Sequence, residues 1–274
     1  MRHHIRITKI DSSNSKDYVI LIHGLGVTEK VWFDPFRERL WLIPFGSLLR
    51  KEKGNLSFVE RLKDNFGIIS WTQKRGSTIE ESARELFQIS KTLGSRNFFF
   101  IAHSRGGLVA RYAVQKYGIS PRAIICLSTP HYGSNLANIV TKRKIFLRFL
   151  CPGTGKHFRT IEELKRGSPF LCALNEEVSI RKESLIPHFD ITGNRTDYFR
   201  VFGLNFFDSF ESFFRKKGLP EIVNGSGDGF VSIDSARSPL TGPDSFYILP
   251  VNHLNILVDR RAQDIVIELL QKFT

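Results

Sequence analysis

The chain has 274 residues, which is long enough for one large domain with a substantial core, and its hydrophobic (41%) and charged (24%) fractions are typical of a globular protein. Its formal net charge of +13 suggests contact with something anionic, such as nucleic acid, a phospholipid surface or an acidic substrate, with solubility alone as an equal alternative. Three cysteines without CxxC spacing argue against a disulfide framework and against a zinc site.

The N-terminal residues 1–16 carry charges but no apolar stretch of signal-peptide length. No apolar run in the chain approaches the roughly 18 residues that cross a bilayer. We therefore expect a reduced, cytoplasmic setting. The positive charge suggests peripheral contact with an anionic membrane surface as an alternative.

Apolar runs and helical patterns then alternate along the chain. Buried strands are predicted at Asp17–Ile22, Gly67–Trp71, Asn97–Ala102, Arg122–Ser128, His188–Thr192 and Phe246–Leu249. These runs are continuously apolar, as in parallel strands that are covered on both faces. Apolar residues at three- and four-residue spacing predict helices at Ile79–Leu93, Gly107–Lys116 and Asn255–Phe273. The alternation predicts a single α/β domain over residues 1–274, with a mostly parallel central sheet and helices on both faces.

Three stretches depart from the alternation and are candidate cap or lid insertions: residues 33–62, 135–187 and 197–220. In the last, Phe206, Phe207, Phe210, Phe213 and Phe214 fall on one helical face, and residues 215–218 give a helix-ending pattern. Such a helix would either lie on a lipid surface or pack on the core as a fixed cap. Residues 142–150, which mix cations with bulky apolar side chains, leave the same two alternatives open.

The stretch FFFIAHSRGGLVAR (Phe98–Arg111) runs from a strand through Ser104 into a helix. A strand that enters S-x-G and then a helix makes a sharp turn, which points the serine hydroxyl at a substrate. The small residues Ala102, Gly106 and Gly107 allow the close backbone approach that such a turn needs. The helix that begins here also directs free N–H groups at the site.

Ser104 needs partners, and candidates follow other strands. The first strand ends in HGLG (residues 23–26), where the N–H of Leu25, together with that of Arg105, would form an oxyanion hole. Asp228 lies in the glycine-rich GSGDGFVS, and His253 lies in LPVNHLNIL, just after the last strand. The order Ser, Asp, His is the order expected for an elbow nucleophile.

Alternatives to this triad exist. Asp190 lies within a predicted strand, and Asp234 is the second choice for the acid. His131 and His188 precede Asp228 in the chain, which argues against either of them as the base.

With these parts in place, the sequence resembles the α/β-hydrolase superfamily, and within it the lipase-like branch that includes GPI inositol-deacylases. The resemblance is carried by IHGLG, AHSRGGLVAR, STPHYGS, GDGFV and VNHLNIL. It implies an α/β-hydrolase fold and a serine hydrolase that cleaves carboxylic esters, often lipid esters. Ala102 departs from the usual glycine, a change that some lipases share. The candidate substrate-binding residues are His23, His103, His131 and Tyr132, with packing or hydrogen bonding beside the site as the alternative role for His23 and His103.

Under this interpretation, Ser104 forms an acyl-enzyme with His253 as base and Asp228 as its orienting acid, and neither a metal nor an organic cofactor is required. An acyltransferase that uses the same triad is one alternative, and a basic, non-catalytic binding protein is another. We find no nucleic-acid-binding motif, so nucleic acid is not an expected partner. The oligomeric state is left open.

Overall fold

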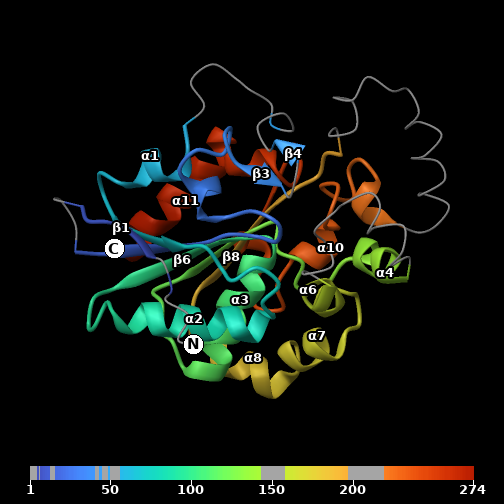
Figure 1. The fold of residues 1–274 in the computed structure, drawn as a ribbon, viewed down its shortest axis with the longest axis horizontal. Coiled ribbons are helices and arrows are strands. Elements are labelled where there is room, and N and C mark those ends of the chain that lie inside the picture. Colours follow the sequence, from blue (N-terminus) through green and yellow to red (C-terminus); the bar gives the residue numbers. More distant parts are fainter. Residues whose placement is uncertain are drawn as a thin grey trace.

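The computed structural model describes residues 5, 7–12, 16–40, 43–44, 49, 56–142, 158–196 and 219–274. Its centre is a seven-stranded sheet in the order β1-β5-β2-β6-β7-β8-β9 (Figure 1). The strands are β1 (Ile7–Ile10), β2 (Tyr18–Ile22), β5 (Gly67–Trp71), β6 (Phe98–His103), β7 (Ile124–Leu127), β8 (His188–Gly193) and β9 (Phe246–Leu249). All neighbouring pairs are parallel except β1 with β5.

All six predicted strands are present within one or two residues of the expected bounds. The edge strand β1 was not among the predicted strands. Strands β2, β5, β6, β7 and β8 are buried along their whole length, which explains why their sequences are apolar without alternation.

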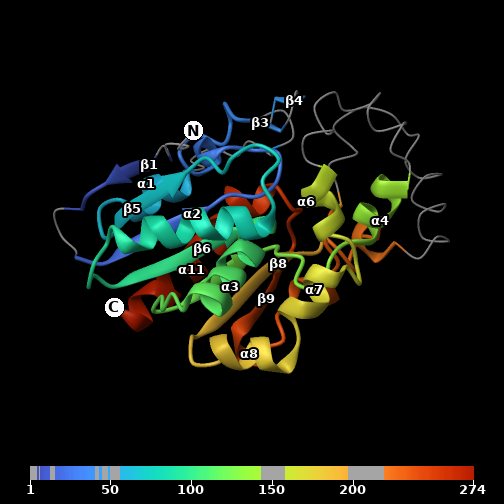
Figure 2. The ribbon, with the colours of Figure 1, turned by 60° about the horizontal axis from the view of Figure 1, so that its bottom comes forward.

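Helices cover both faces of the sheet (Figures 1 and 2). Helices α1 (Phe58–Leu62) and α11 (Arg260–Phe273) pack on one face, where their apolar residues join one buried cluster. Helices α2 (Ile79–Lys91) and α3 (Arg105–Tyr117) cover the other face and contribute to a second cluster. A capping box formed by Thr78 and Glu81 fixes the start of α2.

The predicted helix Asn255–Phe273 is divided in two. A short 3-10 helix, η7, covers Asn255–Leu257, and α11 begins at Arg260. The reason is Asp259, whose side chain accepts hydrogen bonds from the N–H groups of Arg261 and Ala262 and so starts a new helix.

The expected insertions are described in part. Within 33–62 lie a small hairpin, β3 (Arg39–Leu40) with β4 (Ile43–Pro44), and α1, which packs in the core. Within 135–187 lie α4 (Asn135–Lys142), α6 (Phe158–Glu163), α7 (Pro169–Leu174) and α8 (Glu177–Glu183). Figures 1 and 2 show α4, α6 and α7 gathered at one end of the sheet. The phenylalanine-rich helix predicted in 197–220, and all of 142–150 except Lys142, lie outside the described residues.

Among the described residues, none of the helices has the length and apolar character needed to cross a membrane.

Candidate active site

The turn between β6 and α3 holds Ser104 in a strained conformation. Ser104 has φ 53° and ψ −125°, which is a rare backbone geometry for a residue with a side chain. Its N–H donates to the carbonyl oxygen of Leu127 at 2.8 Å, so the ladder between β6 and β7 continues one residue past β6. This places Ser104 at the carboxyl edge of the sheet, immediately before α3.

Two glycines allow this turn. A Cβ atom on Gly106 would lie 2.4 Å from the carbonyl oxygen of Ile22, and one on Gly107 would lie 2.1 Å from Thr129 Oγ1. Real Cβ atoms do not approach so closely, so only glycine fits at either position. Ala102, by contrast, is fully buried in the core cluster below the turn, where its methyl group is accommodated.

Asp228 and His253 form a hydrogen-bonded pair. His253 Nδ1–H donates to Asp228 Oδ2 at 2.8 Å, and the Asp228 side chain is fully buried. The other carboxylate oxygen, Oδ1, accepts from the N–H groups of Phe230 (3.0 Å) and Val231 (2.8 Å). With its proton on Nδ1, His253 keeps Nε2 as a hydrogen-bond acceptor.

The same pair is held by the backbone around it. The N–H of His253 donates to the carbonyl oxygen of Asp228 at 3.0 Å. A Cβ on Gly193, at the end of β8, would lie 3.1 Å from Asp228 Cβ, so the strand end leaves room for the acid. Nearby, the N–H of Gly225 donates to the carbonyl oxygen of Asn194 at 2.7 Å, which joins the two ends of the stretch between β8 and the Asp228 turn.

His253 is also fixed against the serine turn. His103, the residue before Ser104, donates from Nε2 to the carbonyl oxygen of His253 at 2.9 Å, and the two imidazole rings are 4.8 Å apart. Burial holds the pKa of His103 well below its usual range, and the neighbouring His253 adds to this shift. A neutral His103 therefore ties His253 to the end of β6, next to Ser104.

The HGLG loop approaches Ser104 from the end of β2. A Cβ on Gly24 would lie 3.0 Å from Ser104 Cβ, so this loop passes directly beside the serine. Leu25 follows in the loop, and Arg105 supplies the first N–H of α3, for which no earlier turn of that helix offers an acceptor.

His23 anchors this loop. Its Nδ1–H donates to the carbonyl oxygen of Gly24 at 2.8 Å, and its Nε2 accepts from the N–H of Gln73 at 3.0 Å. Burial, together with the smaller effect of the Arg105 charge, lowers the pKa of His23 from 6.5 to about 4, against the opposing effect of the Gly24 bond. His23 is therefore neutral at neutral pH and holds one tautomer.

The Arg105 side chain lies buried beside the same loop. Its guanidinium donates to Gln73 Oε1, to the carbonyl oxygen of Ser77 at 2.9 Å and to Ser82 Oγ at 3.0 Å. Burial lowers the pKa of Arg105 to about 10, which leaves it charged at neutral pH. Within the described residues it has no carboxylate partner at ion-pair distance.

A cavity of about 230 Å³ adjoins this region. It is lined by residues 23–28, Glu38, residues 72–77, Arg105 and Thr160. Gly24 lines the cavity and lies directly beside Ser104, so the cavity adjoins the serine turn on the side of the HGLG loop, although Ser104 is not among its described lining residues.

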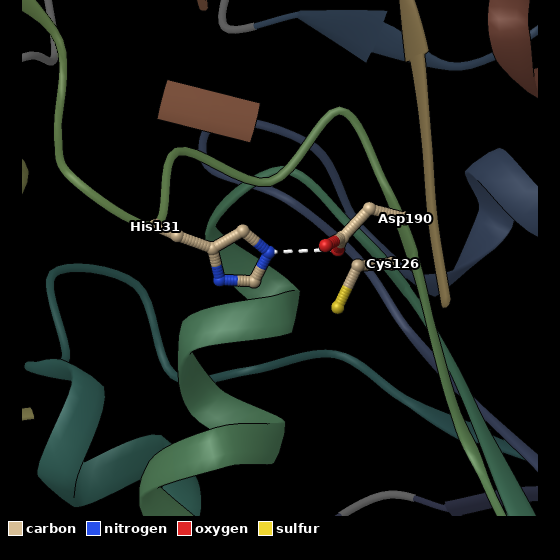
Figure 3. Close-up of side chains that lie close together, drawn as sticks. All are labelled: Cys126, His131 and Asp190. Atoms are coloured by element: carbon tan, nitrogen blue, oxygen red, sulfur yellow. Dashed lines mark hydrogen bonds and ion pairs between the residues drawn. The ribbon is translucent and has the colours of Figure 1, made fainter. Parts of the chain in front are cut away.

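A second histidine–aspartate pair lies deeper in the fold (Figure 3). His131 Nε2–H donates to Asp190 Oδ1 at 2.9 Å, and Asp190 Oδ2 accepts from Ser238 N–H (2.7 Å) and from the Thr241 hydroxyl (2.5 Å). Burial would raise the pKa of Asp190, but His131 and these hydrogen bonds hold it below its usual range. His131 is fully buried, and its Nδ1 faces the Arg111 guanidinium at 3.4 Å.

Cys126 completes a possible donor set with His131 and Asp190, whose ligand atoms lie within 4.8 Å of one another. Cys126 and Asp190 are register partners on β7 and β8, and Figure 3 shows both side chains directed toward His131. Burial raises the pKa of the Cys126 thiol well above its usual value, and the carboxylate already accepts three hydrogen bonds. The arrangement is that of a packed polar network that joins β7 and β8 to the segment after β7.

This network extends to an ion pair with no exposed surface. Arg111 donates to Glu183 Oε1 from Nε (3.0 Å) and from a terminal nitrogen (2.6 Å), and both side chains are 0% exposed. Of the four predicted substrate-binding residues, His23, His103 and His131 are thus buried in hydrogen-bonded positions. Tyr132 is 38% exposed.

Comparison with family models identifies the chain. The model of the family described as "Putative serine esterase (DUF676)" matches residues 57–196, just over half of the chain. The chain belongs to this family. As a DUF676 protein it is a carboxylic ester hydrolase of the esterase/lipase type. The matched stretch contains Ser104 but neither Asp228 nor His253. No curated protein matches the chain in sequence.

Solved structures agree with this membership at the level of the fold. The mature lipase BlEst2 of Bacillus licheniformis has a TM-score of 0.66 at 19% identity, over 97% of this chain and 98% of that one. A monoacylglycerol lipase of Paleococcus ferrophilus has a TM-score of 0.53 at 12% identity, over 99% and 100% of the two chains. A thermophilic esterase of Thermogutta terrifontis has a TM-score of 0.50 at 16% identity, over 98% and 95%. The predicted α/β-hydrolase fold is confirmed.

Proposed function

We propose that this DUF676 protein hydrolyses carboxylic esters, of lipid type in particular, through an acyl-enzyme on Ser104, with His253 as general base and Asp228 as its orienting acid. The observation that carries the proposal is the 2.8 Å hydrogen bond from His253 Nδ1 to Asp228 Oδ2. The carbonyl oxygen of the same His253 accepts a hydrogen bond from His103, the residue before Ser104. These two hydrogen bonds link the serine turn, Asp228 and His253, which are far apart in the sequence, at one edge of the sheet.

In the proposed reaction, His253 Nε2 takes the proton of Ser104 Oγ as the oxygen attacks the ester carbonyl. Asp228 then stabilises the imidazolium, because its buried carboxylate is already bonded to Nδ1. The N–H groups of Leu25 and Arg105 hold the oxyanion. His253 returns the proton to the leaving alcohol, and a water molecule releases the acid from Ser104.

The structure favours positioning roles for three of the four residues first considered for substrate contact. His23, His103 and His131 are each at most 3% exposed. Tyr132 remains the candidate for direct contact with the substrate. The narrower likeness to GPI inositol-deacylases and the contact with an anionic membrane surface stay predictions. The second of these depends on segments outside the described residues.

Labelling with a fluorophosphonate probe tests the proposal. The parent protein should be labelled and Ser104→Ala should not, while both unfold at the same temperature. A panel of 4-nitrophenyl esters of increasing acyl length, together with a phospholipid, then reports the lipid preference. Failure of the probe to label the parent protein would refute the assignment of Ser104 as the nucleophile.

A further inference from the structure

The cavity beside Ser104 has an unusual charge. Among the described residues, its lining contains three cations, Lys74, Arg75 and Arg105, and one carboxylate, Glu38, so these residues give it a formal charge of +2. His23 adds none, because burial keeps its pKa near 4. The cavity is therefore positive at neutral pH.

None of the three cations forms an ion pair within the described residues, although the carboxylates of Glu163, Glu85 and Glu81 act on Arg105 from farther away and favour its charged form. Neither Lys74 nor Arg75 forms an ion pair there, and both side chains are exposed. Arg105 is 3% exposed, is bonded only to uncharged acceptors, and its Nε lacks a partner. A buried guanidinium without a carboxylate is costly unless an anion compensates it.

The one carboxylate of the lining is engaged elsewhere. Glu38 is 8% exposed, and its Oε2 accepts a hydrogen bond from the Thr28 hydroxyl at 2.5 Å. It therefore faces the Thr28 side of the cavity, while the unpaired charges lie on the segment 74–75 and at the start of α3.

The size of the cavity limits what it can hold. Its volume of about 230 Å³ equals that of roughly seven water molecules and falls below the ~300–1,000 Å³ of pockets that enclose whole drug-sized ligands. It suits a small charged group on a substrate better than a long acyl chain. Because the cavity begins at Gly24 beside Ser104, such a group would lie close to the reacting ester.

We propose that this cavity binds an anionic group, a carboxylate or a phosphate, which the ester substrate carries near its scissile bond. The inference rests on the proposed function, because it assigns a substrate class to the same Ser104 site. Lys74 and Arg75 are the specificity-determining residues, and Arg105 supplies a fixed positive charge behind them.

The experiment compares esters that differ only in this charge. On the acyl side, mono-4-nitrophenyl adipate is paired with 4-nitrophenyl hexanoate. On the alcohol side, 2-acetoxyethyl phosphate is paired with 2-methoxyethyl acetate, with acetate release as the readout. Each kcat/KM is divided by the spontaneous hydrolysis rate of the same ester. At least one anionic ester should be preferred about tenfold or more, since two charges a few ångströms away are together worth that much even in a watery environment.

Two double variants locate the preference. Lys74→Gln with Arg75→Gln should reduce it to about twofold or less and leave kcat/KM for the neutral esters within about twofold of the parent. Lys63→Gln with Lys116→Gln removes the same charge from exposed sites outside the cavity and should keep the preference. High salt should weaken the preference of the parent, because the Debye length shortens.

The outcomes separate the two claims. Hydrolysis of the neutral esters without a preference for either anionic partner overturns the inference and leaves the proposed function standing. A preference that survives in the Lys74/Arg75 variant overturns the assignment to this cavity. Failure to hydrolyse any of the four esters, together with absent fluorophosphonate labelling, overturns the proposed function and this inference with it.

Discussion

Acid should destabilise the protein through His23, and the size of the effect follows from its burial. The folded chain binds a proton at His23 with a pKa of about 4, against 6.5 for the ordinary side chain. The unfolded state therefore binds more protons below pH 7, and stability falls as the pH decreases. The contribution is fully present above pH 6.5 and is lost as the pH falls toward 4. Between pH 7 and pH 5 it amounts to about 2 kcal/mol.

The assay is urea unfolding at both pH values for the parent and for His23→Gln, which cannot titrate. The variant is less stable at pH 7 because it loses bonds to Gly24 and Gln73, but its stability should fall about 2 kcal/mol less than that of the parent between pH 7 and pH 5. Gln73→Met is the matched control, since it removes the side-chain hydrogen bond to the His23 carbonyl oxygen in the same loop and leaves the His23 ring in place. The other buried histidines are present in all three proteins, so their contributions to the pH dependence of stability cancel in the comparison. Equal pH dependence in the parent and His23→Gln would contradict the argument.

Three further predictions concern the site and its support. Asp228→Asn should lower kcat about 10⁴-fold with little change in KM, because an amide no longer fixes the tautomer of the base, and steady-state kinetics on a soluble ester would measure this. Gly106→Ala should lower the free energy of unfolding by about 1–3 kcal/mol, since its Cβ would meet a strand carbonyl at 2.4 Å. Gly242→Ala is the control: its Cβ would have nothing within 4 Å, so the free energy of unfolding should hardly change. Glu183→Gln should destabilise by about 3–5 kcal/mol because it leaves Arg111 charged and buried, and chemical denaturation that finds less than ~1 kcal/mol would contradict this.

The central strands and the residues of the candidate site could be predicted from local sequence. Continuous apolar runs identified the central strands, because both faces of each strand are buried. Ser104 and His253 follow strand ends closely, Asp228 lies beside the end of β8, and parallel strands bring their carboxyl ends to one edge. The hydrogen bond between Asp228 and His253 is the geometry that this ordering predicts.

Other features depend on contacts that local sequence does not contain. Strand β1 (ITKI) is short, antiparallel and partly exposed, so its signal is weak. The roles of His103 and His131 arise from partners 150 and 59 residues away. One signal was available: Asp190 within an apolar strand predicts a buried partner, because an unpaired carboxylate is rarely buried. The partner itself could be found only from the fold.

The hydrogen bond between Gly225 and Asn194 has a consequence for how such an enzyme can diversify. This bond joins the residue directly after β8 to a residue three positions before Asp228. Loop closure depends weakly on length, and doubling a loop costs only about 0.6 kcal/mol. While this bond holds, a change in the number of residues between Asn194 and Gly225 need not move Asp228. The position of the proposed acid is thereby tied to the end of β8.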